Sequence, residues 1–164
     1  MNNNDFKKSE LYSYEADVTI WGRKIGIGVD CDSFSLEECL PAINKMIEML
    51  DKGKDRVLSA LFDYGILELA EDWASSAEEA EEYEDNEDVE CYIMEDGTKV
   101  FLPITEEDFA KSLNMEGINI YFDDSADEIN ADVFMFCQPD YFACHSIEVF
   151  VDKDGNIDVN GLAG

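Results

Sequence analysis

The stretch ADVFMFCQPDYFACHSIEVFVDKDGNIDVNGLAG, residues 131–164, decides the fold because it holds two strand patterns joined by a turn. Val133–Cys137 is almost wholly apolar, which predicts a strand buried on both faces of a sheet. Ile147–Val151 has the alternating pattern of a second strand, and Pro139 and Asp140 mark the turn between them. We therefore expect both strands near the centre of a sheet.

A hairpin is predicted near the start of the chain. Tyr14–Trp21 alternates apolar and polar residues, and the same period continues over Ile25–Val29 after a break at Gly22. Gly26 and Gly28 leave the second strand bare on one face, where a helix or another backbone can lie close.

Two helices follow this hairpin in the sequence. Ser35 and Glu38 form a capping box ahead of an amphipathic stripe that ends near Leu50, and Pro41 predicts a kink or a later helix start. After Gly53, apolar residues nearly encircle a segment from about Asp55 to Trp73, which predicts one long buried helix. We expect the two helices to pack as a hairpin against the sheet.

The rest of the chain completes an α+β pattern. Val89–Met94 and Lys99–Leu102 flank an Asp-Gly turn, Thr105 caps a short third helix, and Ile118–Phe122 alternates as a strand. We predict a single α+β domain over residues 1–164. It has an antiparallel or mixed sheet of about six to eight strands, a helical hairpin on one face and a short third helix. Residues 1–9 are polar enough to remain disordered, and residues 76–88 are expected to form an acidic loop.

The charge is the strongest signal about partners. Forty acidic residues against eleven basic ones give a formal net charge of −29. Such a field repels nucleic acid and anionic membranes, and it accelerates encounter with basic proteins by a factor of about 10 to 1,000 at low salt. We expect a basic protein partner, with no nucleic acid and no membrane. The alternative is that the acidic residues only keep the protein soluble, or reflect a habitat of high salt, and select no partner.

Two acidic segments are the predicted contact with this partner. Residues 78–90, EEAEEYEDNEDVE, contain nine acids and no base, and a second group surrounds residue 125. The simpler interpretation of such a run is a solvated helix end or a flexible loop. The functional interpretation is an acidic finger with aromatic anchors that covers a cationic cleft. The predicted partner-binding residues are Trp73, Glu78, Glu79, Glu81, Glu82, Tyr83, Glu84, Asp85, Glu87, Asp88, Asp123, Asp124, Asp127 and Glu128.

A chemical centre is the competing hypothesis. Cys137, Cys144 and His145 lie close in sequence and are ligand types that zinc prefers, or a thiol and a base. Adjacent strand residues point to opposite faces, so Cys144 and His145 cannot share one ion unless the strand breaks there. We therefore expect no metal, no cofactor and no catalytic residue, and a structural His145 bonded to a neighbouring carboxylate or carbonyl.

The location of the protein is predicted from absent signals. The five cysteines are odd in number and form no C-x-x-C pair, which favours reduced thiols. Met1–Lys8 lacks the apolar core of a secretory signal, and no apolar run reaches the roughly 18 residues of a membrane helix. These features predict a cytoplasmic protein.

The C-terminal half resembles a known bacterial family. Ile104–Phe122 and Asp140–Gly164, with the run His145–Glu148 and the closing Asn160–Gly164, are similar to the small bacterial proteins of the domain-of-unknown-function family numbered 2262. This resemblance implies no established activity. By analogy, small acidic bacterial proteins of this kind are often immunity proteins encoded beside polymorphic toxins, which implies a binder rather than an enzyme.

Together these observations predict a non-enzymatic acidic binding protein. The most concrete form is an immunity-type inhibitor that neutralises a basic toxin domain such as a nuclease. The alternatives are a housekeeping domain with incidental acidity, and a metal site or enzyme built on Cys137, Cys144 and His145.

Overall fold

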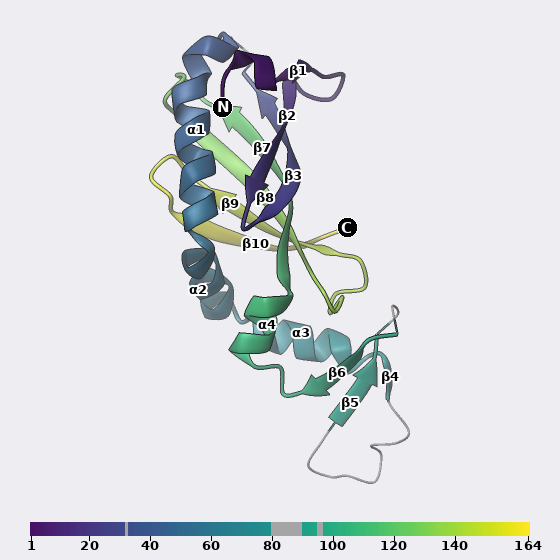
Figure 1. Cartoon of the computed structure of the whole chain (residues 1–164). Helices are drawn as coiled ribbons and strands as arrows, with labels where there is room; N and C mark the ends of the chain where they lie inside the picture. Colours follow the sequence, from purple (N-terminus) through teal and green to yellow (C-terminus); the bar gives the residue numbers. More distant parts are fainter. Residues whose placement is uncertain (32, 80–89, 95–96) are drawn as a thin grey trace.

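A seven-stranded mixed sheet forms the body of the molecule (Figure 1). The computed structural model describes residues 1–31, 33–79, 90–94 and 97–164. The sheet runs, in spatial order, through β1 (Lys7–Lys8), β2 (Tyr14–Ile20), β3 (Arg23–Asp30), β7 (Leu113–Phe122), β8 (Ile129–Cys137), β9 (Ser146–Val151) and β10 (Ile157–Ala163). Neighbouring strands are antiparallel except β3 and β7, which are parallel. The predicted α+β class with a mixed sheet is therefore confirmed.

The other elements lie at the start of the chain and in the long connection between β3 and β7. They are the 3-10 helix η1 (Asn3–Asp5), the helices α1 (Leu36–Lys52), α2 (Lys54–Tyr64), α3 (Ile66–Ala74) and α4 (Glu106–Ser112), and the strands β4 (Glu78–Glu79), β5 (Glu90–Ile93) and β6 (Lys99–Leu102). Strands β4, β5 and β6 form a separate three-stranded antiparallel sheet. The β5–β6 hairpin and the short helix capped by Thr105 were both predicted, and both are confirmed.

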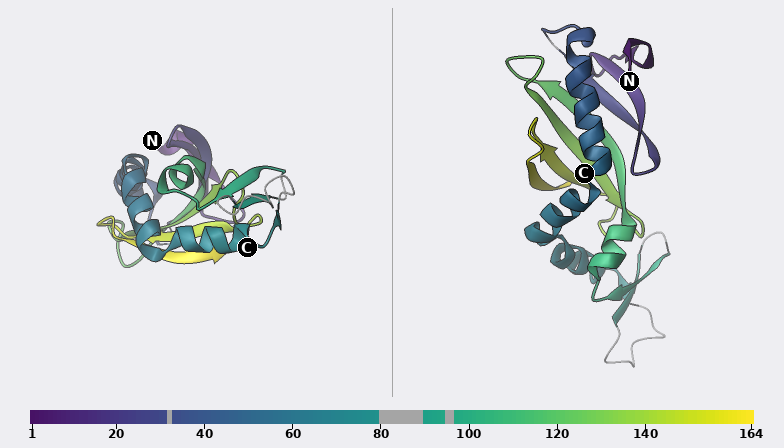
Figure 2. Two further views of the ribbon diagram at one scale, coloured as in Figure 1. Left: turned by 90° about the horizontal axis from the view of Figure 1, so that it is seen from below. Right: turned by 60° about the vertical axis from the view of Figure 1, so that its left-hand side comes forward.

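The core lies between the large sheet and the helices. Helix α1 runs along one face of the sheet (Figures 1 and 2), and alternate residues of each central strand are buried on that face. On β8, Val133 and Met135 are fully buried, whereas Phe134 and Phe136 on the other face are half-buried. The prediction that this strand is buried on both faces is wrong, because its second apolar set faces an open side of the sheet.

The first turn of α1 is built as the sequence predicts. The side chain of Ser35 accepts a hydrogen bond from the backbone of Glu38, and the Glu38 carboxylate accepts one from the backbone N–H of Ser35 at 2.9 Å. The helix begins at Leu36 and contains Pro41, so of the two predicted alternatives, a kink or a later start, the later start is wrong. Near its C-terminal end, the indole Nε1 of Trp21 donates to the carbonyl of Leu50 at 2.9 Å, which ties α1 to the β2–β3 turn.

The predicted helical hairpin is also wrong. A single residue, Gly53, joins α1 to α2, and helical hairpins need about two to five connecting residues to reverse direction. The three helices instead follow one another along the molecule (Figure 1). The expected long second helix is divided at Gly65, whose φ of 90° is left-handed and ends α2.

The chain start and the second sheet both join the main core. Residues 3–5 form a helical turn, Phe6 is buried, and Lys7 and Lys8 pair with β2, so this polar lead-in has regular structure. Met94 and Val100 belong to the same cluster of buried side chains as the large sheet. The face of the large sheet opposite α1 stays open, and a groove lies on it.

Candidate functional site

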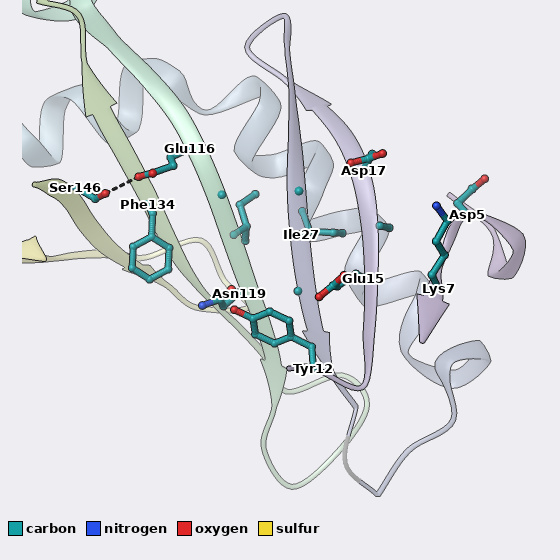
Figure 3. Close-up of a pocket in the computed structure, with 15 residues that line it drawn as sticks. Asp5, Lys7, Tyr12, Glu15, Asp17, Ile27, Glu116, Asn119, Phe134 and Ser146 are labelled. Carbon is teal, nitrogen blue, oxygen red and sulfur yellow. Dashed lines mark hydrogen bonds between the residues drawn. The ribbon is translucent and has the colours of Figure 1, made fainter. Parts of the chain in front are cut away.

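A groove of about 550 Å³ lies on the open face of the large sheet (Figure 3). Strands β2, β3, β7 and β8 contribute most of its lining, and η1, β1, the connection between β1 and β2, and the first residue of β9 complete it. Its lining residues are Asp5, Lys7, Tyr12, Glu15, Ala16, Asp17, Gly26, Ile27, Gly28, Glu116, Gly117, Ile118, Asn119, Phe134 and Ser146. A volume of this size is in the range of ligand-binding sites in proteins.

Glycines form the floor of the groove. Gly26 of β3 and Gly117 of β7 are register partners on paired strands. A Cβ atom built on Gly26 would have no heavy atom within 4 Å, and one on Gly117 would lie 3.7 Å from the Gly26 carbonyl oxygen. Gly28 differs, because the ring of Tyr12 lies 2.7 Å from the position of its Cβ. The expected bare strand is therefore open at Gly26 and covered at Gly28.

Carboxylates surround this floor. Four acidic residues line the groove, Asp5, Glu15, Asp17 and Glu116, against one basic residue, Lys7. Glu15 accepts a hydrogen bond from the Ser9 hydroxyl, and Glu116 accepts one from the Ser146 hydroxyl. Neither hydroxyl donor neutralises the charge of its carboxylate.

Asp17 is the groove carboxylate with a basic partner. Its side chain lies 2.8 Å from the ammonium of Lys24, and this hydrogen bond and charge hold the pKa of Asp17 below its usual value. Both side chains are largely exposed, so the pair contributes little stability. Asp17 therefore stays ionised, and the groove keeps an acidic character at neutral pH.

A β-bulge brings Glu116 to this surface. The β7–β8 register shifts between Met115 and Gly117, which inserts Glu116 as an extra residue. Because a bulge changes the direction of a side chain, Glu116 reaches Ser146 on β9 across the open face. Sequence reasoning missed Glu116 and Ser146, because the bulge and the strand order bring them together and neither is visible as a local pattern.

Aromatic rings complete the groove. Tyr12 and Phe134 lie on either side of the Asn119 amide in Figure 3, and both line the groove. Aromatic faces attract cations, and an amide offers both a donor and an acceptor. The arrangement suits a ligand that presents a cationic group on an otherwise extended body.

The predicted anchor Trp73 packs against two rings of another segment of the chain. The residue is half-buried in α3, and its ring lies 6.3 Å from that of Phe142 and 4.9 Å from that of His145, centroid to centroid. These contacts join α3 to the connection between β8 and β9. A substitution of Trp73 should therefore lower the stability of the fold, whatever its effect on a partner.

The acidic run that follows Trp73 is described only at its edges. Glu78 is exposed and pairs with Ile93, and the backbone of Glu79 pairs with Tyr92. The remaining predicted contact residues lie outside the described residues: Glu81, Glu82, Tyr83, Glu84, Asp85, Glu87 and Asp88.

The second acidic group is the loop between β7 and β8. Asp123, Asp124, Asp127 and Glu128 are all exposed there, and the Asp123 carboxylate accepts a hydrogen bond from the amide of Asn130 at 2.8 Å. This loop and the second sheet lie at opposite ends of the molecule (Figures 1 and 2). The fold therefore keeps the described part of the first acidic segment, Glu78, Glu79 and Glu90, away from this loop.

Cys137, Cys144 and His145 line the same small pocket, between the end of β8 and the start of β9, but they differ in burial. Cys137 is buried and Cys144 is exposed, and burial raises the pKa of the Cys137 thiol to about 12, so this thiol stays protonated at neutral pH. Nδ1 of His145 donates to the carbonyl of Phe142 at 2.9 Å, which confirms the predicted bond to a carbonyl. Among the residues that the structure describes, no group of three or more side chains could hold a metal ion.

Fold and site together define a small α+β protein with an acidic groove on the open face of a mixed sheet. The chain belongs to the family of uncharacterized proteins conserved in bacteria, DUF2262, whose pattern matches residues 5–162. No curated protein and no solved structure matches the chain. No helix within the described ranges is long and apolar enough to cross a membrane.

Proposed function

We propose that this protein is a non-enzymatic acidic binding protein whose partner is a basic protein. The observation that carries this proposal is the groove on the open sheet face, where four carboxylates and one ammonium surround a glycine floor. Charge complementarity of this kind selects a cationic partner and steers its approach. An immunity-type inhibitor that covers the cationic cleft of a nuclease toxin domain is the form of this function that best fits the charge.

The charge balance supports a partner outside the molecule. Even if every basic side chain paired with one carboxylate, 29 negative charges would remain. Several basic residues are already paired on the surface, and the pairs include Lys24–Asp17, Lys52–Glu48, Lys111–Glu107 and Lys153–Asp154. This excess of negative charge favours a basic partner, whose surface can neutralise it.

The test is a capture experiment in two salt conditions. The protein is used as bait in an extract of its source at low salt and at about 0.5 M salt, where exposed charges are largely screened. An unrelated acidic protein of similar net charge is the control bait. We expect one basic protein to survive the high-salt wash on this bait alone, and its activity to fall when the complex is reconstituted from purified proteins. Retention of the same proteins by both baits, or of none, would overturn the proposal.

A pair of double variants locates the contact. Glu15→Lys with Glu116→Lys reverses two charges in the groove, and Asp63→Lys with Glu68→Lys makes the same change at exposed positions on α2 and α3. We expect the captured partner to lose affinity for the groove variant and to keep it for the control variant. Equal loss in both would show that binding depends on total charge alone.

A further inference from the structure

We propose that an extended segment of the basic partner lies across Gly26 and Gly117 and places a lysine or arginine side chain beside Tyr12 and Phe134. This inference rests on the proposed function and names the part of the partner that the groove receives. Three features of the described residues support the inference. Neither backbone geometry nor packing requires glycine at position 26, the groove floor has the width of an extended chain, and carboxylates surround that floor.

Gly26 is not required by the fold. Its φ lies outside the positive range that favours glycine, and a Cβ atom there would have no heavy atom within 4 Å. Glycine inside a strand is unfavourable relative to alanine by about 0.5 to 1 kcal/mol. Since neither backbone geometry nor internal packing accounts for it, the absent side chain leaves room for something outside the chain.

Other glycines of the chain have internal explanations. Gly22, Gly65 and Gly97 have φ angles of 77°, 90° and 79°, which favour glycine over residues with a side chain. Gly28 has the ring of Tyr12 where its side chain would be. Gly26 and its register partner Gly117 remain: neither has a positive φ, and a Cβ atom would meet nothing within 4 Å at Gly26 and only an ordinary contact at 3.7 Å at Gly117.

The floor has the width of an extended chain. Gly26 and Gly117 are partners on adjacent strands, which lie about 4.8 Å apart. The backbones of β3 and β7 already bond to each other and to β2 and β8, so the incoming segment does not add a strand to the sheet. It approaches by close packing of its backbone on the two glycines, with its side chains reaching the walls.

The walls select the charge of those side chains. Glu15 stands near Tyr12 on one side of Asn119 in Figure 3, and Glu116 and Phe134 stand on the other. A guanidinium or ammonium group there gains attraction from the carboxylates and from an aromatic face. An acidic segment would be repelled by the same carboxylates, so the site distinguishes the sign of charge.

The test uses a defined probe. A short peptide of alternating arginine and glycine is titrated into the full chain by calorimetry, with a glutamate–glycine peptide as the charge control. The variant Gly26→Tyr fills the floor, and Thr19→Tyr adds the same side chain at an exposed β2 position outside the groove. Thermal unfolding establishes that both variants are folded. We expect Gly26→Tyr to weaken binding by at least about tenfold, or about 1.4 kcal/mol, and Thr19→Tyr to leave it unchanged.

Nuclear magnetic resonance locates the bound peptide. We expect the backbone amide signals of Gly26, Gly117 and Asn119 to shift, and those of the loop from Asp123 to Glu128 to stay. Equal affinity of Gly26→Tyr and the unmodified protein, shifts confined to that loop, absence of binding, or equal binding of the glutamate peptide would each overturn the inference.

The two proposals fail in different ways. If the captured partner is lost by the Glu15→Lys and Glu116→Lys variant but binds Gly26→Tyr normally, the acidic binder stands and the inserted segment is wrong. If no basic partner is captured, the proposed function itself is wrong.

Discussion

The indole of Trp73 and the imidazole of His145 lie edge to face, with ring centroids 4.9 Å apart and planes inclined at 66°. The imidazole is oriented by a hydrogen bond from its Nδ1 to the carbonyl of Phe142 at 2.9 Å. This pair joins α3 to the connection between β8 and β9, two parts of the chain that are far apart in sequence.

Replacement of Trp73 by alanine should therefore destabilise the protein. The half-buried ring loses contacts with Phe142 and His145, and we expect a loss of about 2 to 4 kcal/mol in the free energy of unfolding. Urea-induced unfolding of both proteins measures this difference in the free energy of unfolding. Leu11→Ala is the matched control, because Leu11 is 83% exposed and its truncation should change stability by less than about 0.5 kcal/mol. A Trp73→Ala protein of normal stability would contradict a structural role for the ring.

Gly65 and Gly26 allow a matched test of backbone geometry. A Cβ atom at either position has open space, but the φ of Gly65 is 90° and that of Gly26 is not positive. We expect Gly65→Ala to cost about 1 to 2 kcal/mol, because an L-residue is strained there. Gly26→Ala should be neutral or slightly stabilising. Thermal unfolding of both variants checks this, and an equal loss in both would contradict it.

The turn between β9 and β10 should make a pH-dependent contribution. The Asp152 carboxylate accepts hydrogen bonds from the Asn156 side chain and from backbone N–H groups, which lowers the Asp152 pKa from its ordinary value of 3.8. Because the folded-state pKa is lowered, the ionised carboxylate stabilises the fold at pH values above the ordinary pKa. This stabilisation is lost as the pH falls through the lowered pKa. We expect the stability difference between the unmodified protein and Asp152→Asn to be largest above pH 3.8 and to shrink in acid. A difference that grows in acid would be the contrary result.

The thiols should differ sharply in reactivity. Cys144 is exposed, whereas Cys31, Cys39, Cys91 and Cys137 are buried. Burial also raises the pKa of Cys39 and of Cys137 to about 12, so neither supplies thiolate at neutral pH. In native buffer, an aromatic disulfide reagent should modify Cys144 rapidly and the buried thiols only after unfolding.

Cys144→Ser identifies this fast reaction. We expect the variant to lack the fast phase while keeping the slow one. Rapid modification that persists in Cys144→Ser would point to an accessible, reactive thiol elsewhere, and it would revive the hypothesis of a cysteine with chemical function.

Local patterns in the sequence predicted those parts of the fold that local physics determines. The alternation from Tyr14 to Val29 correctly predicted the β2–β3 hairpin. The Ser35–Glu38 pair correctly predicted the start of α1. The helix break at Gly65 was missed, because one glycine costs a helix only about 1 kcal/mol and the apolar pattern continues across it. Such a residue can lie inside a helix or end one, and packing decides which.

The groove depends on register between distant strands. Gly26 and Gly117 meet because β3 and β7 are parallel partners, a pairing that no local pattern specifies. The open strand at Gly26 was visible in the sequence, but the bulge that presents Glu116 was not. The acidic runs were prominent by composition, but none of their described residues lines the groove.

The parallel pairing of β3 with β7 also has a consequence for how the chain folds. Residues 31–112, which separate the two strands, must be closed into a single large loop before this pair can form. Contacts of such long sequence separation form slowly, because closing the loop lowers the conformational entropy of the chain before the strand pairing can compensate for it. While a ribosome still holds residues 113–122, the β2–β3 hairpin has one unpaired edge, so the groove is among the last features of the molecule to be assembled.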